Sequence, residues 1–202
     1  MPATIVQPSQ WVPTVTVPQR RKWTVVEFDH MGTLGWFQGR RAYLLDGVVW
    51  EQGPMDPPHA NALEKVTEAV RLAFGPGWRF RIQTPLHLDP FNNPMPDLAV
   101  VAGRPGNHPD HPTTAALVVE VSDSTLDTDL TDKAERYASA GIPDYWILDL
   151  NGSQLLVLRD PAPLPAGLGA TAYRKQQTYG PSEWVSPLAV PNNPILVSDM
   201  LP

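Results

Sequence analysis

Two short apolar runs in the middle of the chain each carry a single carboxylate. Residues 96–101 read Pro-Asp-Leu-Ala-Val-Val, with Asp97 as the acid, and residues 117–122 read Leu-Val-Val-Glu-Val-Ser, with Glu120 as the acid. Both runs are rich in Val and Leu and are bounded by residues that favour turns, which is typical of buried strands. Residues 145–149, Tyr-Trp-Ile-Leu-Asp, have the same character. We therefore predict three buried strands, with Asp97 and Glu120 on two of them.

The chain between the second and third of these strands has the pattern of an amphipathic helix. Residues 128–141 begin with Thr and Asp and end with Gly, and Pro143 follows, so the usual start and stop signals of a helix are present. Lys133 lies three residues after Leu130 and four before Tyr137, at the edge of the apolar stripe, which predicts an inward-facing side chain. The stripe consists of Leu130, Ala134, Tyr137 and Ala138, and the residues that point away from it are Asp132, Glu135 and Arg136.

Shorter patterns predict the elements before and after this segment. Thr24 and Glu27 have the spacing of a capping box, which predicts the start of a short helix. Residues 41–45 and 48–51 flank the turn dipeptide Asp-Gly, which predicts a hairpin whose second strand ends at Glu51. The further elements that we expect are a helix over 59–74, an alternating strand over 79–83, a hairpin strand over 154–158, a loop over 160–169, and one or two edge strands in the tail.

The composition indicates one globular domain with a proline-rich extension. The chain has 202 residues, of which 42% are hydrophobic, and this suffices for one sizeable core but makes a second full domain unexpected. Prolines spaced through residues 1–22 favour an extended arm, and we expect residues 23–202 to form a single domain. Because the chain has no cysteine, any metal must be held by oxygen or imidazole ligands.

The charge of the chain neither requires nor excludes a nucleic-acid partner. The net charge of −6 argues mildly against strong non-specific DNA binding, which depends on Lys and Arg side chains that neutralise phosphates. Basic residues nevertheless cluster at 20–22, at 40–41, and at Arg79 with Arg81, either as solvated surface or as phosphate contacts. No apolar run has the length of a membrane span and the first residues lack a signal-peptide pattern, so we expect a cytoplasmic protein without a membrane partner.

The two strand acids and the helix lysine predict a metal-dependent hydrolytic site. Glu120 is the only ionisable group of its strand, and an ionised carboxylate buried there costs several kcal/mol unless it is paired or binds a metal. Asp97 and Glu120 are therefore candidate ligands of Mg²⁺ or Mn²⁺, and Lys133 is the candidate group that stabilises the attacking water or the developing charge. This arrangement suits phosphodiester hydrolysis. The alternative is that Lys133 only neutralises Glu120 as its salt-bridge partner.

At these positions the chain resembles the Uma-two family, which is assigned to the nucleases of the PD-(D/E)xK restriction-endonuclease-like superfamily. The resemblance implies an α/β fold, with a mixed central sheet flanked by helices and with additional β-hairpins, and it implies Mg²⁺-dependent DNA endonuclease activity. The chain departs from the superfamily pattern at Ser122, where a lysine is usual. The family's remedy is a lysine from the following helix, and Lys133 matches it. The residues that carry the resemblance are Pro96, Asp97, Glu120, Lys133 and the segments 23–28, 45–51, 57–60 and 137–149.

Three further residues are candidates for the site. The resemblance implies that an acid at the position of Glu51 approaches the site. His59, one turn before Leu63 on the inner face of its helix, is either a polar cap or a ligand or base. Gln83, on the polar side of its strand, is a candidate hydrogen-bonding group that lines the site. The acids that we expect to cap the following helix or to stay in solvent are Asp123, Asp127 and Asp129.

Two functions from different classes follow from these features. The first is a Mg²⁺-dependent DNA endonuclease that works as a homodimer, since one site cuts one strand per encounter and two-fold pairing supplies the second. The proline-rich arm is the candidate clasp of that dimer. The alternative is a catalytically degraded copy of the fold that serves as a nucleic-acid or protein-binding module, which Ser122 and the acidic charge suggest.

Overall fold

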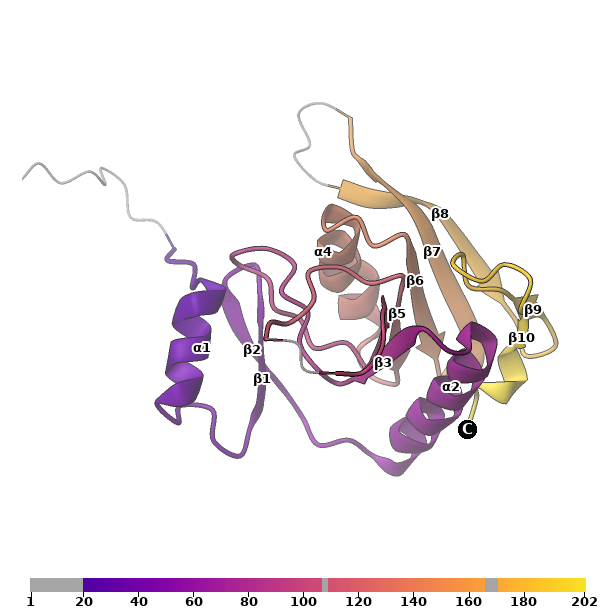
Figure 1. The fold of residues 1–202 in the computed structure, drawn as a ribbon, viewed down its shortest axis with the longest axis horizontal. Coiled ribbons are helices and arrows are strands. Elements are labelled where there is room, and N and C mark those ends of the chain that lie inside the picture. Colours follow the sequence, from indigo (N-terminus) through magenta and orange to yellow (C-terminus); the bar gives the residue numbers. More distant parts are fainter. Residues whose placement is uncertain (1–19, 107–108, 166–170) are drawn as a thin grey trace, which may run out of the picture.

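A six-stranded mixed sheet forms the centre of the computed structural model, which describes residues 20–106, 109–165 and 171–202 (Figure 1). The predicted arm lies almost wholly outside the described residues. In sheet order, the strands are β3 (Trp78–Ile82), β4 (Leu98–Ala102), β5 (Leu117–Ser122), β6 (Asp144–Asp149), β7 (Gln154–Pro163) and β8 (Thr171–Tyr179). β5 and β6 run parallel, whereas the other neighbouring pairs run antiparallel. The predicted mixed central sheet is confirmed.

Helices cover both faces of the inner strands, which explains why these strands are apolar at nearly every position. Alternate residues of a strand point to opposite faces. On one face, Val119 and Trp146 pack with α2 (Pro57–Phe74). On the other face, Val118 and Tyr145 pack with the helical segment that follows β5.

α2 begins earlier than the predicted residue 59, because Asp56 caps it. The Asp56 side chain accepts a hydrogen bond from the His59 backbone N–H (3.0 Å). Pro57 and Pro58 occupy the first turn, where a missing N–H costs nothing. The helix ends at Gly75, whose φ of +67° favours glycine. Among the described residues, no helix combines the length and apolarity needed to cross a membrane.

The helical segment after β5 contains a widened turn that the sequence pattern did not predict. It begins as α3 (Leu126–Thr128), continues as a π-helical turn over Asp129–Lys133, and ends as α4 (Ala134–Ser139). The predicted helix over 128–141 is thus present, but it starts two residues earlier and is irregular in its middle. π-helical turns inside α-helices occur frequently at functional sites.

The first elements form a lobe beside the sheet. α1 (Val25–Thr33) starts with the predicted capping box. The Thr24 and Glu27 side chains each accept a hydrogen bond from the other residue's backbone N–H. β1 (Arg41–Leu45) and β2 (Val48–Gln52) form the predicted hairpin. α1 and the hairpin share a small hydrophobic cluster of their own. Figure 1 shows α1 on the side of the hairpin that faces away from the sheet.

The tail supplies the predicted edge strand, β8, but the strand before it is longer than predicted. The loop predicted over 160–169 is wrong in its first part, because β7 continues to Pro163 and pairs there with β8. β6 pairs with β7 only as far as Arg159, so Pro161 and Pro163 lie beyond that pairing, where β6 needs no N–H from β7. β9 (Trp184–Val185) and β10 (Ile195–Leu196), with a 3₁₀ turn over Val197–Asp199, pack on the α2 side.

Candidate active site

Asp97 and Glu120 lie side by side at the junction of β4 and β5. Asp97 precedes β4 directly, and the antiparallel pairing of the two strands brings it next to Glu120 and Val121. The Val121 N–H donates to Asp97 Oδ2 (2.9 Å), and the Asp97 N–H donates to Glu120 Oε2 (3.4 Å). Both carboxylates are almost fully buried, with 3% and 2% of their residue surface exposed. The structure therefore brings together the two acids that the sequence singles out.

The second oxygen of Asp97 binds two of the further candidates. Asp97 Oδ1 lies 3.2 Å from His59 Nε2 and 3.0 Å from Gln83 Nε2. The cap at Asp56 fixes the start of α2 and thereby places His59 over the end of the sheet. Burial raises the pKa of Asp97, but the hydrogen bonds from His59, Gln83 and Val121 outweigh it and lower the pKa. The same hydrogen bond to Asp97 raises the pKa of His59 despite its partial burial.

Gln83 reaches Asp97 through an unusual backbone conformation. It has a φ of +48°, a left-handed value that non-glycine residues seldom adopt. Its N–H donates to the Asp97 carbonyl oxygen (3.1 Å), while its side-chain amide donates to the carboxylate. The two hydrogen bonds hold this conformation at the end of β3. Strain held in this way often marks a functional site.

Glu120 accepts hydrogen bonds from the helical segment on the other side of the sheet. The Tyr137 hydroxyl donates to Glu120 Oε1 (2.7 Å), and Lys133 Nζ lies 3.1 Å from Glu120 Oε2. Lys133 Nζ also pairs with Asp129 (2.8 Å), whose other oxygen accepts from the Thr125 hydroxyl (2.7 Å). Asp129 and Lys133 are the first and last residues of the π-helical turn, so this turn presents both groups to the end of β5.

The site holds three buried carboxyl groups and one ammonium group. Asp97, Glu120 and Asp129 are all buried, and one ammonium group, that of Lys133, lies among them. Burial raises the pKa of Glu120 to about 8. The charge of Lys133 opposes this increase, and the charges of Asp129 and Asp97 add to it. Burial lowers the pKa of Lys133, but the two carboxylates beside it outweigh that effect and raise the pKa, which keeps the ammonium charged. His59 adds positive charge only when it is protonated.

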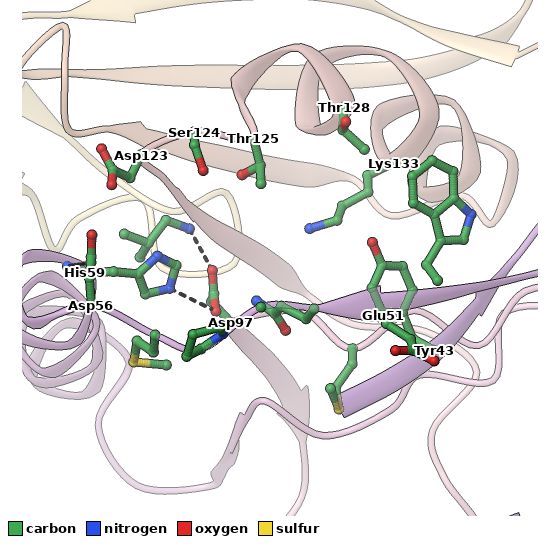
Figure 2. Close-up of a pocket in the computed structure, with 17 residues that line it drawn as sticks. Tyr43, Glu51, Asp56, His59, Asp97, Asp123, Ser124, Thr125, Thr128 and Lys133 are labelled. Atoms are coloured by element: carbon green, nitrogen blue, oxygen red, sulfur yellow. Dashed lines mark hydrogen bonds and ion pairs between the residues drawn. The ribbon is translucent and has the colours of Figure 1, made fainter. Parts of the chain in front are cut away.

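A pocket of about 260 Å³ opens onto these groups (Figure 2). Asp97 and Lys133 line it from the sheet and helix, and Figure 2 shows Tyr43 and Glu51 on the hairpin side. Glu51 contributes to the wall, but its carboxylate pairs with Arg40 (2.6 Å). Glu51 therefore lies on the pocket without joining the buried cluster.

The structure thus assembles five of the six candidate residues in one cluster: Asp97, Glu120, Lys133, His59 and Gln83. Two members of the cluster, Asp129 and Tyr137, are not predicted by the sequence pattern. Asp129, expected to cap a helix or stay in solvent, is buried against Lys133, and its spacing of four residues from that lysine was the available signal. Tyr137 was assigned to the apolar stripe, and no pattern in the sequence showed that its hydroxyl would reach Glu120.

The donor set suits a hard divalent cation. Among the described residues, no group of three or more His, Asp or Glu side chains is arranged to enclose a metal. Mg²⁺ usually keeps several of its waters and takes only one or two carboxylates, so the adjacent pair of Asp97 and Glu120 suffices. A cation beside Glu120 would also stabilise the ionised form of that carboxyl group, which burial disfavours. By donor type, the carboxylate oxygens of Asp97 and Glu120 are compatible with Mg²⁺ or Mn²⁺.

Known proteins share this fold and sequence pattern. A crystal structure described as a putative nuclease belonging to DUF820 from Anabaena variabilis superimposes with a TM-score of 0.61 at 12% identity. The match covers 79% of this chain and 88% of the other, and at this identity it shows the fold alone. Among curated proteins, none matches. The family model described as "Uma2: Putative restriction endonuclease" matches residues 26–196, which is more than half of the chain. The chain therefore belongs to the Uma2 family.

Proposed function

We propose that this protein is a Mg²⁺-dependent DNA endonuclease that hydrolyses phosphodiester bonds, with Mn²⁺ as a substitute metal. The observation that carries the proposal is the junction of Asp97, Glu120 and Lys133. Two adjacent carboxylates and one ammonium group come from three separate elements and meet beside an open pocket. The Uma2 family membership supports the same reaction class.

Each group in the cluster has a distinct part in this reaction. Asp97 and Glu120 would hold Mg²⁺, which, when bound, polarises the phosphate and activates a water. Lys133 lines the pocket and stabilises the negative charge that develops on the phosphate oxygens. Water attacks phosphorus, and the bond to the leaving sugar oxygen breaks. The attacking water loses a proton, and the leaving oxygen gains one. His59 lines the pocket and is the candidate for one of these transfers.

Positioning residues support the carboxylates. Gln83 and the Val121 N–H fix the orientation of Asp97 by donating to its two oxygens. Tyr137 fixes Glu120 in the same way. Because catalysis by held groups depends on geometry, loss of these hydrogen bonds slows the reaction without removing a ligand.

A second function, that of a binding module without catalysis, is favoured by the hydrogen-bond partners that Glu120 already has. Both of its oxygens already accept from Tyr137 and Lys133, and Ser122 stands where the superfamily usually has a lysine. A module of this kind binds nucleic acid or protein with no need for a metal. Metal dependence therefore separates the two functions.

The test is cleavage of labelled single-stranded and double-stranded DNA with Mg²⁺, with Mn²⁺ and with a chelator. We expect wild type to cleave only with metal, and Asp97→Asn and Glu120→Gln to lose cleavage while they still fold. Asp132→Asn is the matched control, since Asp132 is an exposed acid on the same helical segment. Thermal melts provide a second readout, because a ligand that binds the folded state raises its stability. Equal metal-induced stabilisation in wild type and both active-site variants would exclude this site.

A further inference from the structure

A second group of basic residues lies on the edge strand β3, away from the cluster of carboxylates. Arg79 and Arg81 are two residues apart, so they lie on the same face of the strand, opposite Phe80 and its contacts with the α2 core. Both are partly buried. Together with His111 they line a pocket of about 330 Å³. For this basic pair, the sequence allows two alternatives: the side chains lie in solvent, or they contact phosphates.

Hydrogen bonds hold Arg81 and His111 in place. Arg81 Nη2 donates to the Pro85 carbonyl oxygen (3.2 Å) and lies 2.8 Å from His111 Nδ1. A guanidinium can only donate, so His111 Nδ1 is the acceptor and the proton of this neutral ring lies on Nε2. Burial, His87 and Arg81 lower the pKa of His111, in agreement with this neutral form. His111 therefore adds an N–H donor to the guanidinium groups.

Among the described residues, no acid forms an ion pair with Arg79 or Arg81. Within the described part of the chain, neither guanidinium forms an ion pair, and the Nε atoms of both are buried without an acceptor. Asp110 lines the pocket, and Asp29 and Asp110 both act electrostatically on His111, but neither acid forms an ion pair with Arg79 or Arg81. In a chain with a net charge of −6, two neighbouring guanidinium groups without an ion pair are a local feature.

A purely structural role does not account for this arrangement. Edge strands often carry charged residues that prevent pairing with other chains, and such side chains extend into solvent. Arg79 and Arg81 are instead partly buried, and Arg81 is fixed by two partners. Partly buried guanidinium groups without a paired acid are suited to phosphate, whose geometry they match better than a lysine does.

We propose that Arg79, Arg81 and His111 form a binding site for backbone phosphates of the nucleic acid. This inference rests on the proposed function, and it adds where the strand is held outside the site of cleavage. The position along β3 supports it, since Gln83 follows Arg81 by two residues and its amide donates to Asp97 (3.0 Å). Two residues of a strand span about 6.6 Å, so a nucleic acid held at Arg81 lies close to the carboxylates.

The experiment measures DNA binding at several salt concentrations without metal, by fluorescence anisotropy of a labelled oligonucleotide. Each phosphate contact adds about 0.9 to the slope of log affinity against log salt for duplex DNA, and about 0.7 for a single strand. We expect Arg79→Gln with Arg81→Gln to lower the slope by about one to two and to weaken binding roughly tenfold or more. Lysine at both positions should restore the slope, because it keeps the charge.

Arg174→Gln is the matched control. Arg174 is an exposed arginine on β8 that pairs with Asp160 (2.7 Å), and its loss should leave the slope unchanged. A wild-type slope in the Arg79→Gln, Arg81→Gln variant overturns the phosphate site, whether or not the protein cleaves DNA. A lowered slope in a protein that cleaves no DNA supports the phosphate site and removes the nuclease proposal. If inorganic phosphate shifts the His111 ring resonances but DNA does not bind, nucleic acid is excluded as the occupant.

Discussion

Glu120 shares one ammonium group with a second carboxylate while both are out of contact with water. Lys133 Nζ lies 3.1 Å from Glu120 and 2.8 Å from Asp129, and Asp97 adjoins from the next strand. One ammonium group could not fully offset three ionised carboxylates in a buried site, so Glu120 keeps its proton to a higher pH than usual. The residue-scale consequence is that the protonation of Glu120, with a pKa of about 8, affects folding at ordinary pH.

Glu120→Gln should remove part of the pH dependence of stability in the metal-free protein. The folded-state pKa of Glu120 is raised from 4.5 to about 8, so its contribution to stability is complete below 4.5 and is lost as pH rises toward 8. Across that window the free energy of unfolding of wild type should fall relative to the variant by up to about 1.4 kcal/mol per pH unit. Urea unfolding in a chelating buffer measures it. A difference that does not change with pH would contradict this account.

Lys133→Met should slow the proposed reaction more than it weakens metal binding. The substitution keeps the apolar stem and deletes the ammonium group near the phosphate. We expect single-turnover cleavage at saturating metal to fall on the order of a hundredfold, the usual loss for one electrostatic group. The free energy of unfolding should also fall at neutral pH, because two carboxylates lose their partner. Lys175→Met on exposed β8 is the control, and an unchanged rate would reduce Lys133 to a salt-bridge partner.

At the scale of elements, regular patterns were predictable and departures from them were not. Apolar runs bounded by turn residues located β4, β5 and β6, and with them the positions of Asp97 and Glu120. Helical periodicity predicted that Lys133 faces inward, and its contact with Glu120 confirms this. Periodicity assumes a constant rotation per residue, so it could not give the π-helical turn that buries Asp129. The extension of β7 was hidden because its prolines are compatible with a strand only where one edge is unpaired.

Deleting Thr131 tests the role of the π-helical turn. Thr131 is an exposed residue within the turn, and one residue fewer restores the spacing of an α-helix. Asp129 and Lys133 would then be three residues apart, still on one face of an α-helix but shifted relative to Glu120 and Thr125. Cleavage should fall on the order of a hundredfold because the groups are misplaced. The melting temperature should change little, since a regular helix replaces the widened turn. Thr131→Ala keeps the length and is the control; full activity of the deletion variant would show that the turn is dispensable.

At the scale of the whole molecule, the homodimer and its clasp stay predictions. A protein with one site cuts one strand per encounter, and two-fold pairing supplies the second cut. We expect sedimentation to show a dimer at concentrations up to about 100 μM. This limit lies well above a typical micromolar dissociation constant. Removal of residues 1–19, within the predicted arm, should weaken the dimer while leaving the melting temperature of the remaining chain unchanged. A monomer at every concentration would end this proposal.

The pocket has two walls that belong to different parts of the chain. Asp97 and Lys133 come from the sheet and its helix, whereas Tyr43 and Trp50 come from the hairpin, whose hydrophobic cluster is shared with α1 and not with the sheet. Heritable changes in the hairpin can therefore accumulate with little effect on the geometry of the carboxylates. During evolution, substitutions in the hairpin can therefore change which molecules enter the pocket, while Asp97 and Lys133 are retained.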